Sequence, residues 1–516
     1  MAWLRTCFHT FVFAAYPVLV VVGANAGVLP LDGIVIARCL AVAVAVTTIL
    51  LVLVKPLIRD LATRAACLSF VFIGFSLYAV VGGVSMHPGL AALYATACVA
   101  VAVLVIRPWT GRPRTSRGFN LAAAAALVAN LYSCAPAALG GHSWQPAADA
   151  LIDGIVTSAR QVDSGPKPDI YHVVLDGFGR PDILEERFAL DLDPFVAALE
   201  ARGFTVPARS RSNYAQTYLS LGSNLNLSYL DRVTAGMTDS SDRRVLDYLI
   251  EHNALGKLAR RAGYRLVAIG SDYAATDWIE SADECRCEQY GLHEIEATAI
   301  SLTPLRVLMP DRWTYGGHRL KVEAAFRHAR SVAKDARPTL LFAHVLAPHP
   351  PFVFHADGRP RANRARLFTL TDGSQYHGSR EEYVAGYREQ AQYIAGEVLT
   401  LVDAILAQPG PSPVIVLHGD HGPGSTRDAE YVTGESARER MGIFSAYRLP
   451  GDEPAALGPD VSPVNALRVV ANRYLGTALP PLPDLSFAST WDQPYRFVLV
   501  DADGAREASN QVIRPN

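Results

Sequence analysis

The sequence has little net charge, and no internal repeat or low-complexity tract stands out. Its formal net charge is −2 over 516 residues. Proteins that bind nucleic acids usually carry a strongly basic face or stripe instead. The charge balance therefore argues against a nucleic-acid-binding protein, and the length indicates two or three structural units.

The part of the chain outside the apolar N-terminal segments contains only two cysteines, too few for a cysteine-based metal site. Five of the seven cysteines lie in apolar N-terminal segments, where a small buried hydrophobic side chain explains each of them. The other two, Cys285 and Cys287, are one residue apart, and no CxxC motif or Cys/His cluster accompanies them. This pattern argues against a cysteine-based zinc site. The sequence leaves open whether the pair forms a disulfide, which an oxidising compartment would permit.

Half of the residues are hydrophobic, and the excess lies almost entirely in the first quarter of the chain. A helix needs about 20 apolar residues to cross a bilayer. Five stretches meet this requirement: Phe8–Asn25, Ile34–Val54, Ala65–Val84, Gly89–Ile106 and Leu121–Leu139. A cleaved signal peptide would explain only the first stretch. We therefore predict a membrane region of about five transmembrane helices over residues 1–140.

Basic residues in the short loops predict the orientation of these helices. The first and third loops contain almost no Lys or Arg, whereas the N-terminus and the even loops contain Arg5, Lys55, Arg59, Arg64, Arg107, Arg112, Arg114 and Arg117. Such loops face the cytoplasm. An odd number of crossings then places the rest of the chain outside. Arg38, near the outer end of the second segment, conflicts mildly with this topology, and we expect it to reach the interface.

The predicted location is therefore the bacterial inner (plasma) membrane, with the catalytic domain on its periplasmic or extracellular side. The bacterial origin is inferred only from the frequent use of Ala, Arg and Val. We interpret residues 141–167 as a juxtamembrane linker and residues 168–516 as the catalytic domain.

The C-terminal part alternates between short apolar runs and longer helical patterns. The predicted strands are Ile170–Leu175, Arg265–Ile269, Thr339–Val345, Val414–Leu417 and Gly442–Arg448. The predicted helices are Asp193–Arg202, Arg243–Ala262, Lys321–Ala333, Arg380–Ala407 and Pro463–Tyr474. This alternation predicts an α/β domain with a largely parallel central sheet and helices on both faces. In such sheets, ligands bind at the carboxyl ends of the strands.

Polar groups follow three of the predicted strands. Asp176 and Gly177 follow the first strand, His349 follows the third, and the sequence HGDHG at residues 418–422 follows the fourth. A single Asp-Gly pair after a strand is usually only a turn. Two imidazoles and a carboxylate within four residues are costly to crowd together unless an ion is bound. We therefore predict that the three strand ends share one metal or anion site.

A fourth segment, Ser212–Asn226, contains Asn213 and the hydroxyls of Thr217, Ser220 and Ser223. Small polar residues before a helix suit its N-terminus, where free N–H groups favour an anion. A hydroxyl at that place is a candidate nucleophile, because a divalent metal would lower its pKa. Taken alone, the segment is explained as well by an N-cap and a polar helix face.

Four ordered blocks carry a resemblance to a known family: PDIYHVVLDGFGR, SNYAQTYLSLGS, FAHVLAPHPPF and VIVLHGDHG. The later MGIFSAYRLPG and SPVNALRVVANRYLG look like that family's closing strand and helix. Over roughly residues 168–487, the chain resembles the alkaline phosphatase superfamily. The most similar branches are the sulfatase-like enzymes and the phosphoglycerol or phosphoethanolamine transferases, which include membrane enzymes like lipoteichoic acid synthase.

The resemblance implies roles for individual residues. The implied metal ligands are Asp176, Thr217, Asp420 and His421. Thr217 is also the implied nucleophile, and His349 matches a histidine that contacts the transferred group or assists the leaving group. Four nearby residues are candidates for substrate binding, although structural hydrogen bonding explains them equally well: Asn213, Arg180, His344 and His418.

Three departures narrow the assignment. Thr217 is not the Cys or Ser that formylglycine-type sulfatases oxidise, and threonine is what the lipid-dependent phosphotransferases use. No histidine follows His421, whereas two-metal relatives use a further late histidine, so we expect one divalent metal ion. Mixed nitrogen and oxygen ligands favour Zn²⁺ or Mn²⁺ over Ca²⁺. Asp176 stands where many phosphoethanolamine transferases and lipoteichoic acid synthases have Glu, so the chain is not a close copy of either.

The resulting hypothesis is a membrane-anchored, metal-dependent transferase. It would move a phosphoglycerol- or phosphoethanolamine-type group from a membrane lipid donor to an envelope glycan or lipid through a phosphothreonine intermediate. The first alternative is a hydrolase of the same superfamily, a phosphodiesterase or sulfatase that uses water as acceptor. The second is a catalytically silent membrane scaffold. The sequence names neither the donor head group nor the acceptor.

Overall fold

The computed structural model describes residues 2–28, 31–82, 88–109, 113–139, 142–160, 167–332, 337–362, 368–426, 434–451 and 457–505. They form two compact units. The first unit holds Met1–Gly141, Tyr290–Gly317 and Asn363–Thr369. The second unit holds His142–Gln289, His318–Ala362 and Leu370–Asn516.

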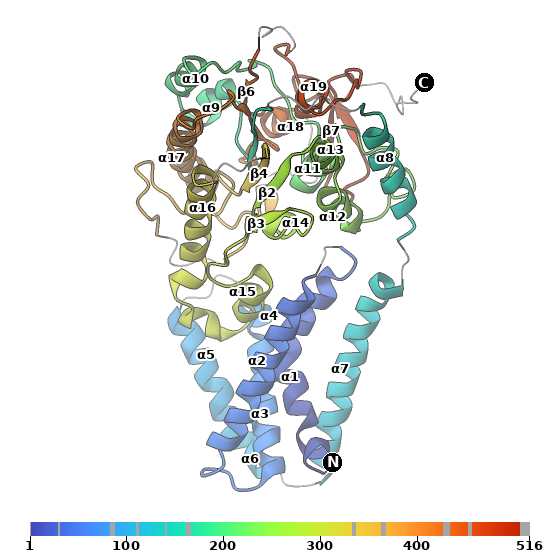
Figure 1. Cartoon of the computed structure of the whole chain (residues 1–516). Coiled ribbons are helices and arrows are strands. Elements are labelled where there is room, and N and C mark those ends of the chain that lie inside the picture. The colour runs from blue at the N-terminus through green and yellow to red at the C-terminus, as the bar shows by residue number, and fades with distance from the viewer. Residues whose placement is uncertain are drawn as a thin grey trace. The chain divides into compact units, whose positions relative to one another are not determined.

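The first unit is built from apolar helices (Figure 1). They are α1 (Ala2–Asn25), α2 (Gly33–Leu53), α3 (Leu61–Ser76), α4 (Tyr78–Gly82), α5 (Pro88–Val101), the π-helical η1 (Ala102–Ile106), α6 (Arg107–Trp109) and α7 (Pro113–Leu139). Among the described residues, three stretches are long and apolar enough to cross a membrane: Arg5–Asn25, Gly33–Leu53 and Thr115–Ala135.

The third and fourth predicted spans correspond to shorter apolar helices, Leu61–Ser76 and Gly89–Leu104. The helical run of the third span is interrupted between α3 and α4, at Leu77. Residues 83 and 84 of that predicted span lie outside the described residues, as does Arg112 of the following loop. The number of five crossings therefore stays a prediction.

A segment from the predicted catalytic domain belongs to this first unit. It contains α15 (Glu294–Ser301) and the short 3-10 helices η2 (Pro304–Leu308) and η3 (Asp311–Trp313). Ala299 of α15 packs in a buried apolar cluster with Val18 and Val21 of α1. Glu296 of α15 forms an ion pair with Arg38, with 2.7 Å between Oε1 of Glu296 and Nε of Arg38. Arg38, whose position conflicted mildly with the predicted topology, therefore has an acidic partner.

The second unit is built on a six-stranded sheet in the order β3-β2-β4-β1-β5-β6. Its strands are β1 (Ile170–Leu175), β2 (Arg265–Ile269), β3 (Glu284–Arg286), β4 (Thr339–Val345), β5 (Val414–Gly419) and β6 (Ser445–Arg448). Every neighbouring pair is parallel except β5 and β6. The predicted α/β fold class is confirmed.

Three strands escaped the sequence analysis. They are β3 and the two-stranded sheet of β7 (Ser486–Ala488) and β8 (Val498–Val500). Each has three residues, which is too short for an alternating pattern to be recognised. A disulfide joins Cys285 of β3 to Cys287, so the structure decides the pairing that the sequence left open.

Helices lie to both sides of the large sheet, for example α17 on one side and α11 to α13 on the other (Figure 1). The helices that begin in the first half of the unit are α8 (Gln145–Thr157), α9 (Pro181–Phe188), α10 (Asp193–Glu200), α11 (Thr217–Leu225), α12 (Arg244–Glu251), α13 (Ala254–Arg261) and α14 (Ala274–Asp277). The later helices are α16 (Tyr315–Arg330), η4 (Gly373–Gln375), α17 (Arg380–Leu406), α18 (Glu435–Met441) and α19 (Pro463–Tyr474).

Four of the five predicted helices differ in extent: α10 ends two residues earlier than predicted, α17 ends one residue earlier, and two others differ more. The predicted helix Arg243–Ala262 is divided into α12 and α13, because the Asn253 side chain accepts the Gly256 N–H at 2.7 Å and starts a new helix. The helix predicted to begin at Lys321 already begins at Tyr315, and its predicted end, Ala333, lies outside the described residues. Residues 161–166 of the predicted linker also lie outside them, while α8 forms its amphipathic part.

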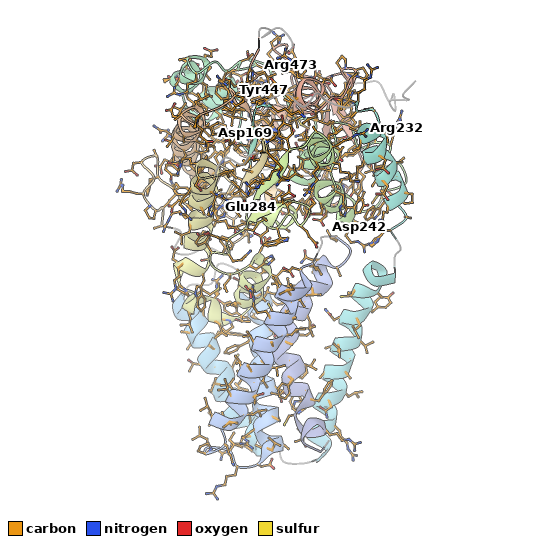
Figure 2. All side chains as sticks on the ribbon, viewed as in Figure 1. Asp169, Arg232, Asp242, Glu284, Tyr447 and Arg473 are labelled. Atoms are coloured by element: carbon orange, nitrogen blue, oxygen red, sulfur yellow. A yellow bond between two sulfur atoms is a disulfide. The ribbon has the colours of Figure 1, made fainter. Side chains whose placement is uncertain are left out.

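Asp169, labelled in Figure 2, fixes the amino ends of three central strands. Its carboxylate accepts the Thr339 N–H at 2.7 Å, and its carbonyl accepts the Val414 N–H at 2.9 Å. The strands then run in register, so that Leu175 at the end of β1 lies opposite Val345 and Gly419. The residues that follow these three strands are therefore brought to one edge of the sheet.

Two buried histidines face each other across β1 and β5. The Nε2 atoms of His172 and His418 are 2.9 Å apart, and Nδ1 of His418 lies 3.0 Å from the Gly419 carbonyl. The carbonyl can only accept, so Nδ1–H of His418 donates to it, and Nε2–H of His172 donates to His418. Burial lowers the pKa of His418 to about 4 and places the pKa of His172 well below its usual value.

This pair predicts sensitivity to acid. Because the two pKa values are lower in the folded chain, the unfolded chain binds more protons between pH 6.5 and 4. Stability therefore falls as the pH decreases through that window, by about 3 kcal/mol at pH 4 for His418 alone, at about 1.4 kcal/mol per pKa unit. We expect His172→Gln, which keeps an N–H donor, to lose less melting temperature between pH 7.5 and 5 than the wild type. His355→Gln, a control at a half-exposed histidine paired with Glu389, should behave like the wild type. An unchanged pH dependence in His172→Gln would contradict the assignment.

Candidate active site

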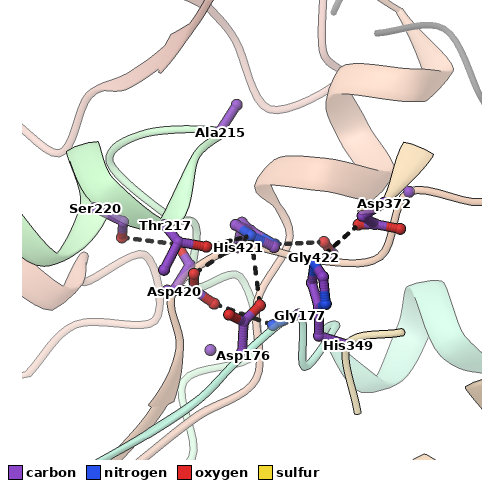
Figure 3. A network of polar contacts seen from close by, with 12 residues as sticks. Asp176, Gly177, Ala215, Thr217, Ser220, His349, Asp372, Asp420, His421 and Gly422 are labelled. Carbon is purple, nitrogen blue, oxygen red and sulfur yellow. Dashed lines mark hydrogen bonds and ion pairs between the residues drawn. The ribbon is translucent and has the colours of Figure 1, made fainter. Parts of the chain in front are cut away.

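Five predicted site residues meet at the carboxyl edge of the sheet (Figure 3). Asp176 follows β1, His349 follows β4, and Asp420 and His421 follow β5, while Thr217 is the first residue of α11. All five side chains are buried. The structure thus brings the three strand ends and the hydroxyl-bearing helix into one place. The roles assigned to these residues stay predictions.

Three of these residues offer ligand atoms for a metal ion. Donor atoms of Asp176, Asp420 and His421 all lie within 4.8 Å of one another. Nε2 of His421 is 3.6 Å from Oδ1 of Asp176 and 3.3 Å from Oδ2 of Asp420. Among the described residues, these same two buried carboxylate oxygens have no hydrogen-bond partner. A buried, uncompensated carboxylate oxygen is costly, so this donor set fits a divalent cation.

Neighbouring groups orient the donors. The second oxygen of Asp176 lies 3.1 Å from Nε2 of His344, and the second oxygen of Asp420 accepts the Gly177 N–H at 3.0 Å. Nδ1 of His421 is 2.9 Å from the Gly422 carbonyl, so Nδ1 carries the proton and the lone pair on Nε2 points into the site. Such outer contacts fix the tautomer and direction of a metal ligand.

The electrostatics favour the ligand forms of these groups. Burial, together with the nearby Arg440 guanidinium, lowers the pKa of His421, which keeps its imidazole neutral. Burial alone would raise the pKa of Asp176, but His349, the His344 hydrogen bond and His421 together bring it below its usual value. Asp176 is therefore a carboxylate and His421 a free base at neutral pH.

The Thr217 hydroxyl lies at the same place. Its Oγ1 is 3.1 Å from Nε2 of His421. As the first residue of α11, Thr217 stands at a helix N-terminus, where unpaired N–H groups favour a bound anion. Ser220, one turn later, donates to the Asp420 carbonyl at 2.8 Å and ties the helix to the ligand loop.

His349 stands beside this group. Its backbone N–H donates to the Asp176 carbonyl at 2.9 Å, and its Nδ1 is 2.6 Å from the Pro350 carbonyl. The proton therefore sits on Nδ1, which leaves Nε2 able to accept one. Nε2 is 4.0 Å from Oδ2 of Asp372.

Sequence reasoning missed Asp372 and Arg440. Asp372 is buried and accepts hydrogen bonds from Tyr383 at 2.8 Å and from Arg440. Burial alone would raise the pKa of Asp372, but Arg440 and His349 bring it below its usual value. Neither residue belongs to a recognisable block, and only the folded chain brings them beside His349 and His421.

The four predicted substrate-binding residues have different surroundings. Nε2 of His344 lies 3.1 Å from Oδ2 of Asp176, and its Nδ1 shares a 2.9 Å hydrogen bond with the Thr276 hydroxyl. The other three have partners elsewhere in the fold: Asn213 with Tyr229 and Leu485, Arg180 with Asp182, and His418 with His172. A role in substrate binding stays a prediction for all four.

Comparison with known families identifies the class of protein. A model of the sulfatase family matches residues 168–448, which is more than half of the chain. The chain belongs to the sulfatase family, and its predicted place among the sulfatase-like members of the alkaline phosphatase superfamily is confirmed. It is an enzyme of this sulfatase-like class. No curated protein matches it in sequence.

Solved structures give more distant likenesses. The C-terminal periplasmic domain of EptC from Escherichia coli is 14% identical, with a TM-score of 0.43, over 67% of this chain and 95% of that one. Lipooligosaccharide phosphoethanolamine transferase A from Neisseria meningitidis, an integral membrane protein, is 12% identical, with a TM-score of 0.39, over 91% and 95%. An alkaline phosphatase superfamily protein from Vibrio parahaemolyticus is 10% identical, with a TM-score of 0.38, over 68% and 83%. These likenesses are too remote to assign a substrate.

The donor set predicts that each carboxylate is needed for metal binding. We expect Asp420→Asn to weaken zinc binding at least about 100-fold, since losing an outer-shell partner alone costs about 10- to 100-fold. Added Zn²⁺ should raise the melting temperature of the wild type, because binding to the folded state stabilises it, and should do so far less in the variant. Asp182→Asn, at a half-exposed carboxylate paired with Arg180, is the matched control. A full zinc-induced shift in Asp420→Asn would contradict the site.

Proposed function

We propose that this chain is a membrane-anchored, metal-dependent phosphotransferase that works through a phosphothreonine at Thr217. It would take a phosphoglycerol- or phosphoethanolamine-type group from a membrane lipid and pass it to an envelope glycan or lipid. The observation that carries the proposal is the Thr217 hydroxyl, 3.1 Å from His421 Nε2 and at a helix N-terminus. At Thr217, a nucleophile would lie beside both a cation site and an anion site.

In the first step, Thr217 Oγ1 forms a bond to phosphorus while the bond from phosphorus to the lipid oxygen breaks. The hydroxyl proton of Thr217 is lost, and the departing lipid oxygen gains one, so a neutral lipid alcohol leaves. A divalent ion held by Asp176, Asp420 and His421 would lower the pKa of the Thr217 hydroxyl and neutralise charge on the phosphoryl oxygens. The free N–H groups at the start of α11 favour the same anion.

In the second step, an acceptor hydroxyl loses its proton and bonds to phosphorus, and the bond from phosphorus to Thr217 breaks. His349 would move the proton at one departing or attacking oxygen. Its Nδ1 is committed to the Pro350 carbonyl, so Nε2 is the atom that exchanges the proton. The neighbouring Asp372 carboxylate would stabilise the imidazolium that forms.

The membrane helices support a lipid donor. The first unit contains three helices long and apolar enough to cross a bilayer, and the chain tethers the site to them. By charge distribution, the catalytic domain would lie on the periplasmic or extracellular side of the inner membrane. Zn²⁺ and Mn²⁺ are the preferred ions for this ligand set. The transferase reading competes mainly with a hydrolase of the same family, which would use water in the second step.

The covalent intermediate gives a direct test. Thr217→Ala should abolish phosphothreonine formation, measured as a mass increase on the peptide that contains residue 217. Thr217→Ser keeps a hydroxyl at the same atom and should retain part of the activity. Zinc content should stay near that of the wild type, because Asp176, Asp420 and His421 remain. A phosphorylated chain in Thr217→Ala would contradict the assignment of the nucleophile.

The acceptor separates transferase from hydrolase. We expect envelope lipids and glycans from cells that lack the gene to lose the mass of one phospho-substituent, which mass spectrometry can detect. Restoring the wild type should recover that mass, and restoring Thr217→Ala should not. If the purified chain released the group into water as fast as onto any glycan or lipid acceptor, the hydrolase would be the better description.

A further inference from the structure

Arg440 is locked in place by the loops that build the site. Its Nε donates to the Ala215 carbonyl at 3.0 Å, and its Nη1 donates to the Gly422 carbonyl at 3.2 Å and to the Asp372 carboxylate. Its own carbonyl accepts the Gly422 N–H at 2.6 Å. Ala215 lies two residues before Thr217, and Gly422 directly follows His421. The guanidinium is therefore fixed relative to both the nucleophile and the ligand loop.

The remaining edge of the guanidinium faces the site. Its Nη2 lies 3.0 Å from Nε2 of His421 and donates to the lone pair there. That lone pair is the one His421 offers to a metal ion, and Oγ1 of Thr217 also lies 3.1 Å from it. A metal ion bound to Nε2 would occupy the lone pair. With a cation on His421, the Nη2–H would lose its acceptor. The Arg440 side chain is only 19% exposed, and a buried donor without a partner is costly.

The charges of the site agree with an anion as the replacement partner. Asp176, Asp420 and Asp372 contribute three carboxylates, and Arg440 contributes one fixed positive charge. A single divalent cation would balance the remaining negative charge. A bound anion would then lie between two positive charges, the metal ion and the Arg440 guanidinium. The planar set of N–H donors of a guanidinium suits the oxygens of a phosphoryl group.

We propose that Nη2 of Arg440 binds an oxygen of the phosphoryl group that passes to and from Thr217. This proposal rests on the proposed function, and it adds a substrate-binding residue that no sequence block indicated. Asp372 acts as a positioning residue, since it holds Nη1 and leaves Nη2 turned toward the substrate. The arrangement supplies a second positive charge with only one metal ion.

The test uses the full-length, detergent-solubilised chain loaded with zinc and titrated calorimetrically with inorganic phosphate. A hydrogen bond to a charged group contributes about 1.5–3 kcal/mol, so Arg440→Gln should bind phosphate about 10- to 100-fold more weakly. Arg440→Lys should fall between it and the wild type. Zinc content should be unchanged in both variants. Arg438→Gln is the matched control, because Arg438 lies on the same helix, is 28% exposed and pairs with Glu186.

One result would overturn the proposal: Arg440→Gln that keeps its zinc and binds phosphate as tightly as the zinc-loaded wild type. If Arg440→Gln does not fold, Arg440→Lys and Asp372→Asn decide by the same titration. Phosphothreonine at Thr217 is measured separately, so its absence would remove the transferase while the titration still decides the role of Arg440.

Discussion

Two buried carboxylate oxygens to which no described residue donates a hydrogen bond are the constraint on which this structure depends. Asp176 and Asp420 directly follow neighbouring parallel strands, and the register of β1 and β5 brings both residues to the same edge of the sheet. Oδ1 of Asp176 and Oδ2 of Asp420 are the two oxygens. Two such groups repel each other and lose hydration, so the fold has to offer compensation. It does so partly with fixed donors, His344 and the Gly177 N–H, and leaves the rest to a cation.

The rest of the second unit arranges partners around this point. The His421 tautomer is set by the Gly422 carbonyl, and α11 is tied by Ser220 to the Asp420 carbonyl. Gly422 itself must be glycine, since an added Cβ would lie 2.1 Å from the Glu439 carbonyl. That close approach is what lets α18 present Arg440 to the ligand loop. Packing, hydrogen bonding and charge therefore converge on one small volume.

The first unit shows where sequence patterns lose information. Hydropathy located the apolar helices, yet it could not show the break at Leu77 or the π-helical turn at Ala102–Ile106, since both keep an apolar composition. Nor could it show that Tyr290–Gly317, far along the chain, packs with those helices. Arg38 looked misplaced in an apolar segment because its partner, Glu296, lies 258 residues away.

The sequence by itself determined the class of fold, the exact bounds of β1, β2 and β4, and the polar groups that follow the strands. The alternation of short apolar runs with helical patterns and the polar residues at strand ends are local features of the sequence. Local features can be recognised without knowledge of the fold. Tertiary structure decided that Asp372 and Arg440 join the site, that Asn213 and Arg180 have partners elsewhere, and that Cys285 bonds to Cys287. The places of Asp372, Arg440 and Asn213 depend on contacts between segments far apart in the sequence, which only the folded backbone defines. The Arg180–Asp182 and Cys285–Cys287 pairs lie two residues apart, so the local backbone conformation decides them.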